Sequence, residues 1–163
     1  KYGKKETFII SQSISVIGYI LFWFLFIPGK PYMFLYALPF FSFGIGGLFT
    51  LMMSMTADTC DYEELENGLP RKEGSFGAIY WWMVKLGTAL AGLLSGLIMY
   101  YVGFSADASS QPERALTGLR IAYSTIPIIG TLIAIYVMSD YEINEDRAAE
   151  IRSQLQERKG DMK

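Results

Sequence analysis

The chain has 163 residues, of which 52% are hydrophobic, and a net charge of −2. It contains no histidine, which excludes the usual proton relay and most transition-metal chemistry. Its one cysteine, Cys60, excludes an internal disulfide.

Four long stretches of the chain are nearly free of charge. Charged residues are absent from 7–29, 31–57 and 121–139, and only Lys85 interrupts the stretch 74–106. Each stretch reaches the ~20 residues that a membrane-spanning helix needs, and in lipid the backbone must satisfy its own hydrogen bonds. The predicted fold is therefore an all-α integral membrane protein with a transmembrane region at 7–138, its four transmembrane helices being 7–27, 31–56, 75–102 and 119–138.

Short polar segments connect the predicted spans. Residues 1–6 are basic, and Pro28-Gly29-Lys30-Pro31 predicts a tight turn between antiparallel helices. A charged loop is predicted at 57–74, and a polar loop at 105–114. The chain is therefore expected to run up and down through the membrane.

Three glycines lie close together in the second predicted span, at Gly44, Gly46 and Gly47. Glycine has no side chain, so such a cluster either interrupts a helix or lets a neighbouring helix approach closely. The sequence leaves both roles open.

The tail, 139–163, is expected to lie outside the membrane. Within it Ala148, Ile151 and Leu155 share one face of a helix, and Asn144 precedes them. The pattern predicts a short amphipathic helix with Asn144 as its N-cap.

Lysine and arginine are divided unevenly between the two sides of the predicted bundle. One side carries Lys1, Lys4, Lys5, Arg71, Lys72, Arg147, Arg152, Arg158, Lys159 and Lys163. The other carries Lys30, Arg114 and Arg120. Because cytoplasmic loops are rich in lysine and arginine, the first side is predicted to be cytoplasmic, with both ends of the chain inside.

Lys85 is the one charge in the stretch 74–106, which contains the third predicted span. About ten helical residues separate it from the preceding charged loop, which puts its ammonium about 15 Å deep in a hydrocarbon core about 30 Å thick. A charge there costs at least ~2.5–3.5 kcal/mol, so it normally faces a polar cavity or a counter-charge. We interpret Lys85 as functional; a purely structural ion pair within the bundle is the alternative.

Small residues share the predicted helix face of Lys85. Gly92 and Gly96 lie seven and eleven residues after it and form a small-xxx-small pair that favours close helix packing. This face is expected to point into the bundle rather than at lipid. Trp81, four residues before Lys85, shares the face, and its indole could stack on a sugar ring; core packing is the alternative role.

The densest group of charges follows the second span. Asp58 and Asp61 are three residues apart, which places them on one face of a helix end. No nucleophile, metal ligand or phosphate loop accompanies them, so an enzyme is not predicted. We interpret the group as a latch between helix ends, whose strength differs between two conformations. An ordinary solvated loop is the alternative. The latch would comprise Asp58, Asp61, Glu64, Arg71 and Lys72.

These residues also carry a family resemblance. The run Ala-Asp-x-x-Asp-Tyr-x-Glu from Ala57 is followed by Gly68, then Arg71-Lys72-Glu73-Gly74, then Trp81-Trp82-Met83-Val84-Lys85-Leu86-Gly87. In order, spacing and topological side this pattern resembles the glycoside–pentoside–hexuronide:cation symporters, which include the melibiose carriers, within the major facilitator superfamily. One departure is Leu69-Pro70, which adds one residue to the common pattern and leaves open which acid Arg71 contacts.

The resemblance implies a C-terminal fragment of a sugar transporter driven by symport of Na⁺ or H⁺, in a bacterial cytoplasmic membrane. The four spans would be helices 9–12 of a twelve-helix bundle that works by alternating access. Lys85 matches the family's intramembrane lysine near the sugar and cation sites, and Asp58, Asp61 and Arg71 match positions of its cytoplasmic gate.

The implied partners are a sugar, the coupling cation, the lipid bilayer and the missing N-terminal helices of the same carrier, which would hold most of the cation ligands. No cofactor, resident metal or nucleic acid is expected. Which sugar and which cation are bound stays open.

A complete small four-helix membrane protein is the main alternative, either an oligomeric exporter or a non-transporting scaffold subunit. Exporters of this size use a glutamate in the first span, whereas the polar groups here are Ser11, Gln12, Ser13 and Ser15. A scaffold would leave Lys85 unexplained.

Overall fold

The computed structural model describes the chain except residues 1–2, 28, 31, 69, 109 and 162–163. Within this part the chain is helical and contains no strand. Its elements are α1 (Lys4–Leu25), the 3₁₀ helix η1 (Met33–Tyr36), α2 (Leu38–Asn67), α3 (Glu73–Val102), α4 (Glu113–Ser139) and α5 (Glu145–Asp161). Helices α1 to α4 are each long and apolar enough to cross a membrane. The prediction of an all-α protein with four spans is confirmed.

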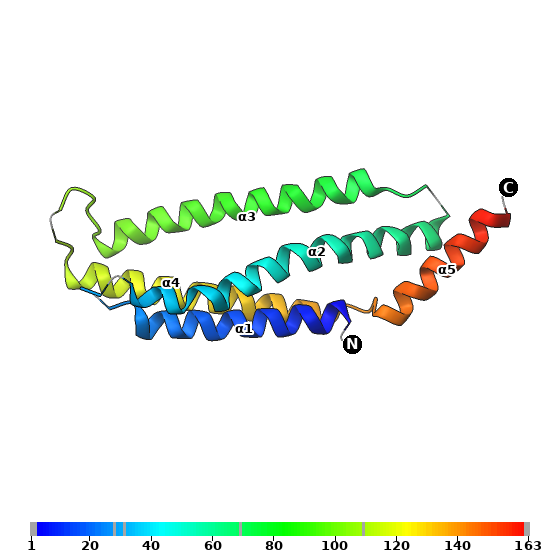
Figure 1. Cartoon of the computed structure of the whole chain (residues 1–163). Coiled ribbons are helices and arrows are strands. Elements are labelled where there is room, and N and C mark those ends of the chain that lie inside the picture. The colour runs from blue at the N-terminus through cyan, green and yellow to red at the C-terminus, as the bar shows by residue number, and fades with distance from the viewer. Residues whose placement is uncertain (1–2, 28, 31, 69, 109, 162–163) are drawn as a thin grey trace.

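The four long helices run side by side in an elongated bundle (Figure 1). Helix α1 packs against both α2 and α4, whereas α3 contacts α4 and α2 much less. Helix α5 lies at one end and packs on α2. We call this end, where α1 begins at Lys4, α2 ends at Asn67, α3 begins at Glu73 and α4 ends at Ser139, the charged end.

Gly44 allows α1 and α2 to approach closely. A Cβ atom on Gly44 would lie 1.6 Å from Ser15 Oγ and 3.0 Å from the carbonyl oxygen of Ser11. Gln12 Nε2 donates a hydrogen bond of 2.9 Å to the carbonyl of Gly44, and Ser11, Gln12 and Ser15 are all buried. Helix α2 is continuous here, so Gly44 and Gly47 serve close packing against α1, and the cluster does not interrupt the helix.

Helix α2 extends beyond the predicted C-terminal boundary of the second span, which corrects the prediction. It continues through 57–67, where a loop was predicted, and stops at Gly68, whose φ of +68° is left-handed. The connection to α3 is thereby reduced to 68–72. The absence of charge marks the thickness of the hydrocarbon, but a helix ends only where a residue such as glycine takes the chain out of helical geometry.

Other boundaries differ for similar reasons. Helix α1 begins at Lys4 and α4 begins at Glu113, because charged residues continue a helix beyond the lipid; α1 ends at Leu25, two residues before the predicted end. The second span begins with η1 and then α2 at Leu38, with a proline in its first turn. Pro28 and Pro31 of the predicted turn, Leu69 of the predicted loop, and the outermost residues of the segments 1–6 and 139–163 lie outside the described residues.

The predicted tail helix is confirmed as α5. Asn144 Oδ1 accepts a hydrogen bond of 2.8 Å from the backbone N–H of Arg147, which is the expected N-cap contact. Ala148, Ile151 and Leu155 are 3%, 1% and 5% exposed, so the predicted apolar face is the face that α5 buries.

Candidate functional site

Lys85 lies on the face of α3 that turns away from α4. With about 100° of rotation per residue, the α3 residues that face α4 lie on average roughly 200° around the helix axis from Lys85. They are Gly87, Leu90, Ala91, Leu94, Ser95 and Ile98. Lys85 is exposed, and no carboxylate of the described residues forms an ion pair with it. Within this part of the chain nothing supports the alternative of a structural ion pair.

Gly92 and Gly96 do not pack against another helix of this chain. A Cβ atom on either glycine would meet no other atom within 4 Å in the structure described. Among the four helices described, α3 contacts α4 through its opposite face, so the packing role of Gly92 and Gly96 stays a prediction. Trp81 is 49% exposed, and its ring contacts that of Tyr80 at 5.4 Å between centroids. Lys85, Trp81, Gly92 and Gly96 thus form one exposed stripe.

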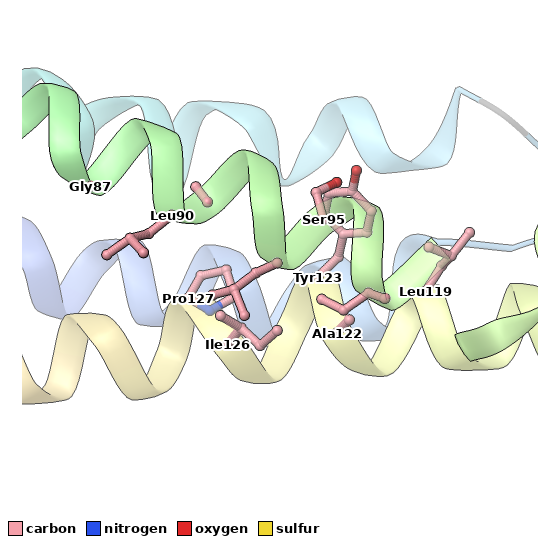
Figure 2. Close-up of a pocket in the computed structure, with 11 residues that line it drawn as sticks. Gly87, Leu90, Ser95, Leu119, Ala122, Tyr123, Ile126 and Pro127 are labelled. Atoms are coloured by element: carbon pink, nitrogen blue, oxygen red, sulfur yellow. The ribbon is translucent and has the colours of Figure 1, made fainter. Parts of the chain in front are cut away.

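A cavity of about 400 Å³ lies between α3 and α4 on the other side of α3 (Figure 2). Its lining is almost entirely apolar, with Leu90 and Leu94 on α3 facing Leu119 and Ile126 on α4. Sugars need dense hydrogen bonding, which such walls do not supply. This cavity is therefore a poor sugar site, and the stripe around Lys85 is the better candidate.

Asp58 forms a nearly buried ion pair at the charged end. Its Oδ2 lies 2.5 Å from Lys4 Nζ on α1, and the two side chains are 6% and 23% exposed. The pair joins the start of α1 to α2, so in this structure Asp58 fastens two helices of the same bundle. Lys4 was not singled out from the sequence, since only the register of α1 against α2 makes it the partner.

Arg71 and Lys72 fasten the short connection between α2 and α3. Arg71 lies 3.2 Å from Asp61 and 2.9 Å from Glu73. Lys72 Nζ lies 2.5 Å from Glu63, an acid outside the predicted latch. The structure thus pairs Arg71 with Asp61 and Glu73, and Lys72 with Glu63, while the role of these residues as a latch stays a prediction.

Glu64, the remaining acid of the predicted latch, faces α5. Its Oε1 lies 2.8 Å from Lys159 Nζ, and its side chain is only 11% exposed. The other oxygen of its carboxylate, Oε2, is buried without a hydrogen-bond partner in the described part of the chain, and the same holds for Oε2 of Glu63. These two oxygens can accept further hydrogen bonds from a cation.

The segment after α4 is tied to α1 and α2. Lys5 Nζ donates hydrogen bonds to the carbonyl oxygens of Ser139, at 2.6 Å, and Tyr141, at 3.1 Å. A cation at this position also suits the negative end of the α4 dipole. Burial, and then the nearby Asp58 carboxylate, raise the pKa of the Tyr141 phenol. The phenol therefore stays neutral across the physiological range.

The model of the MFS/sugar transport protein family matches residues 1–145. The chain belongs to this family. The relationship confirms the predicted resemblance to glycoside–pentoside–hexuronide:cation symporters of the major facilitator superfamily, and makes the chain part of a multi-pass membrane protein. No solved structure matches it.

Three bacterial relatives from Escherichia coli (strain K12) are informative. The "Glucuronide carrier protein homolog" is 30% identical over 159 residues, which cover 98% of this chain and 34% of the relative. The "Putative glycoside/cation symporter YagG" is 32% identical over 105 residues, 64% of this chain and 23% of the relative. The "Putative sulfoquinovose importer" is 30% identical over 159 residues, 97% of this chain and 33% of the relative. The chain spans about a third or less of the length of these curated relatives.

Proposed function

We propose that these residues form the C-terminal third of a secondary transporter that couples sugar uptake to symport of Na⁺ or H⁺. Their spans would be helices 9–12 of a twelve-helix carrier. The family, the share of each relative that is covered, and the names of the relatives support this: a glucuronide carrier homologue, a glycoside/cation symporter and a sulfoquinovose importer. Most ligands of the coupling cation would then lie outside this chain.

The exposed stripe on α3 is the observation that carries the proposal. Lys85 lies deep in a span, away from α4, without an ion pair in the described chain. In hydrocarbon such a charge is costly, so this face would line a polar cavity against the rest of the carrier. The small residues Gly92 and Gly96 leave room for a ligand beside the helix.

In that cavity Lys85 would do two things. Its ammonium has three donors, which can bind sugar hydroxyls or an acidic group of the sugar. When the cavity is empty, its positive charge would repel the coupling cation, so sugar and cation binding would depend on one another. The Trp81 indole, exposed on the same face, would stack on the sugar ring.

The charged end would be the cytoplasmic gate. Facilitator-type carriers alternate access by rocking one half against the other. The pair Asp61–Arg71 holds the end of α2 to the start of α3. The excess of lysine and arginine at this end supports a cytoplasmic orientation, in a bacterial cytoplasmic membrane.

The test is cation-driven uptake by the full-length carrier in membrane vesicles, with glucuronides, sulfoquinovose and pentose glycosides as the substrate panel. Lys85→Ala should abolish coupled uptake while the carrier is inserted in normal amounts. Ser95→Ala, on the α4-facing side of the same helix, is the matched control and should transport normally. Normal accumulation by Lys85→Ala, or no uptake of any of these sugars by the wild type, would contradict the proposal.

A further inference from the structure

Helix α5 is seated on the part of α2 that extends beyond the predicted span. Its apolar face is short, consisting of Ala148, Ile151 and Leu155, and all three are buried. Residues 140–144 connect it to α4, and Lys5 ties the start of this connection to α1. The helix is thus anchored at its first turn, while the contacts of its last turns in the described part of the chain are with α2 and Gly68 at its end.

Polar contacts hold those last turns. Lys159 Nζ lies 2.8 Å from Glu64 Oε1, and Arg158 Nη2 donates a long hydrogen bond of 3.5 Å to the carbonyl oxygen of Gly68, where α2 ends. The lysine side chain is 57% exposed, so the ion pair is screened by salt and contributes little by itself. A helix held by three apolar side chains and such a pair can open locally at modest cost.

The ion pair also fixes the register of the two helices. Cys60 precedes Glu64 by one turn on α2, as Leu155 precedes Lys159 by one turn on α5. Both Cys60 and Leu155 are buried, at 2% and 5% exposure. Leu155 therefore lies one turn before the ion pair on the buried face of α5, and a side chain at this position is accessible only when α5 leaves α2.

We propose that α5 is a releasable strap that withholds Glu64 from the gate. With the strap docked, Lys159 occupies one oxygen of the Glu64 carboxylate and the apolar contact keeps the other buried without a partner. With the strap released, both oxygens can accept a cation presented by the rest of the carrier, which would strengthen the closed gate. This second step rests on the proposed function; the docking itself does not.

Thiol labelling in the intact protein in its membrane tests the docking. A single cysteine is introduced at Leu155, in a background where Cys60 and any cysteine elsewhere in the protein are replaced by serine. Labelling of Leu155→Cys by N-ethylmaleimide should be slow, and it should become at least about tenfold faster when Ile151→Asp is added. Lys159→Gln, a surface change that leaves the fold intact, should speed labelling by about two- to fivefold.

Arg147→Gln is the matched control, because Arg147 pairs with Glu150 on the exposed side of the same helix. It should not alter the labelling rate. Rapid labelling of Leu155→Cys alone, or equal rates with and without Ile151→Asp and Lys159→Gln, would overturn the strap.

Uptake by the same membranes tests the effect on the gate. Lys159→Gln should lower the maximal rate by about two- to fivefold, and this loss should disappear in a Glu64→Gln background, where no carboxylate is released. Equal slowing in both backgrounds would overturn the regulatory role. Absence of uptake in the wild type would instead refute the proposed function, and the labelling result would still decide whether the strap exists.

Discussion

Removing the cation of the Lys4–Asp58 pair should weaken the bundle substantially. Loss of one partner from a fully buried pair costs about 3–5 kcal/mol, because a charge is left without compensation. Here the Asp58 side chain is 6% exposed and that of Lys4 is 23% exposed. Solvent near the charged end reduces the cost, and we expect Lys4→Ala to lower the free energy of unfolding by about 2–3 kcal/mol.

The reverse change should cost less. Asp58→Asn keeps the shape of the side chain, and the longer Lys4 can turn toward water, so a loss of about 1–2 kcal/mol is expected. The variant Lys4→Ala/Asp58→Asn should lose less than the sum of the two single changes, by about 1 kcal/mol or more.

Titration with sodium dodecyl sulfate, followed by the helical circular dichroism signal of the detergent-solubilised protein, measures these differences. Lys72→Ala is the control, since the Lys72–Glu63 pair is more exposed, at 41% and 19%. It should cost about 0–1 kcal/mol. If Lys4→Ala is no more destabilising than Lys72→Ala, the assignment of the Lys4–Asp58 pair as the fastening between α1 and α2 is wrong.

Further variants test other contacts. Gly44→Ala should destabilise the protein by about 1–3 kcal/mol in the same titration, because its Cβ would clash with Ser15 Oγ. Gly46→Ala, whose Cβ would meet no atom within 4 Å, should be neutral or slightly stabilising. Equal effects of the two changes would refute the close contact of α1 and α2. Asn144→Ala should cost α5 about 1 kcal/mol and speed amide hydrogen exchange in its first turns, and unchanged exchange would count against the cap. Burial and Asp58 raise the pKa of Tyr141 above its usual 10.0, so this phenol favours the folded state below about pH 10 and opposes it as the pH rises further. The variant Tyr141→Phe should therefore unfold at a higher alkaline pH than the wild type. The same alkaline midpoint for both proteins would show that Tyr141 is not buried.

The four spans could be predicted because hydrocarbon excludes charge over a fixed thickness, and the sequence records that thickness directly. The C-terminal end of α2 and the N-terminal end of α4 could not be predicted from hydrophobicity, because both helices continue as helices into water. For α2 a different signal was present: Gly68 follows a run of acids, glycine is a local stop signal, and α2 ends there.

The candidate site was predictable in part. The depth of Lys85 follows from counting residues along a helix, and its shared face with Trp81 and Gly92 follows from helical periodicity. The side of α3 that contacts α4 cannot be predicted in this way, because it depends on contacts between whole helices. The Lys4–Asp58 pair spans 54 residues of sequence, and it exists only through the register of α1 against α2.

The central claim is that the Lys85 face of α3 lines the path of the sugar. Single cysteines at Gly92 and at Leu94, on opposite faces of α3, test this in the full-length carrier by the rate of labelling with N-ethylmaleimide, with and without a sugar that the wild type transports. We expect the sugar to slow labelling at position 92 and to leave position 94 unaffected. Equal protection at both positions, or protection at position 94 alone, would contradict the assignment.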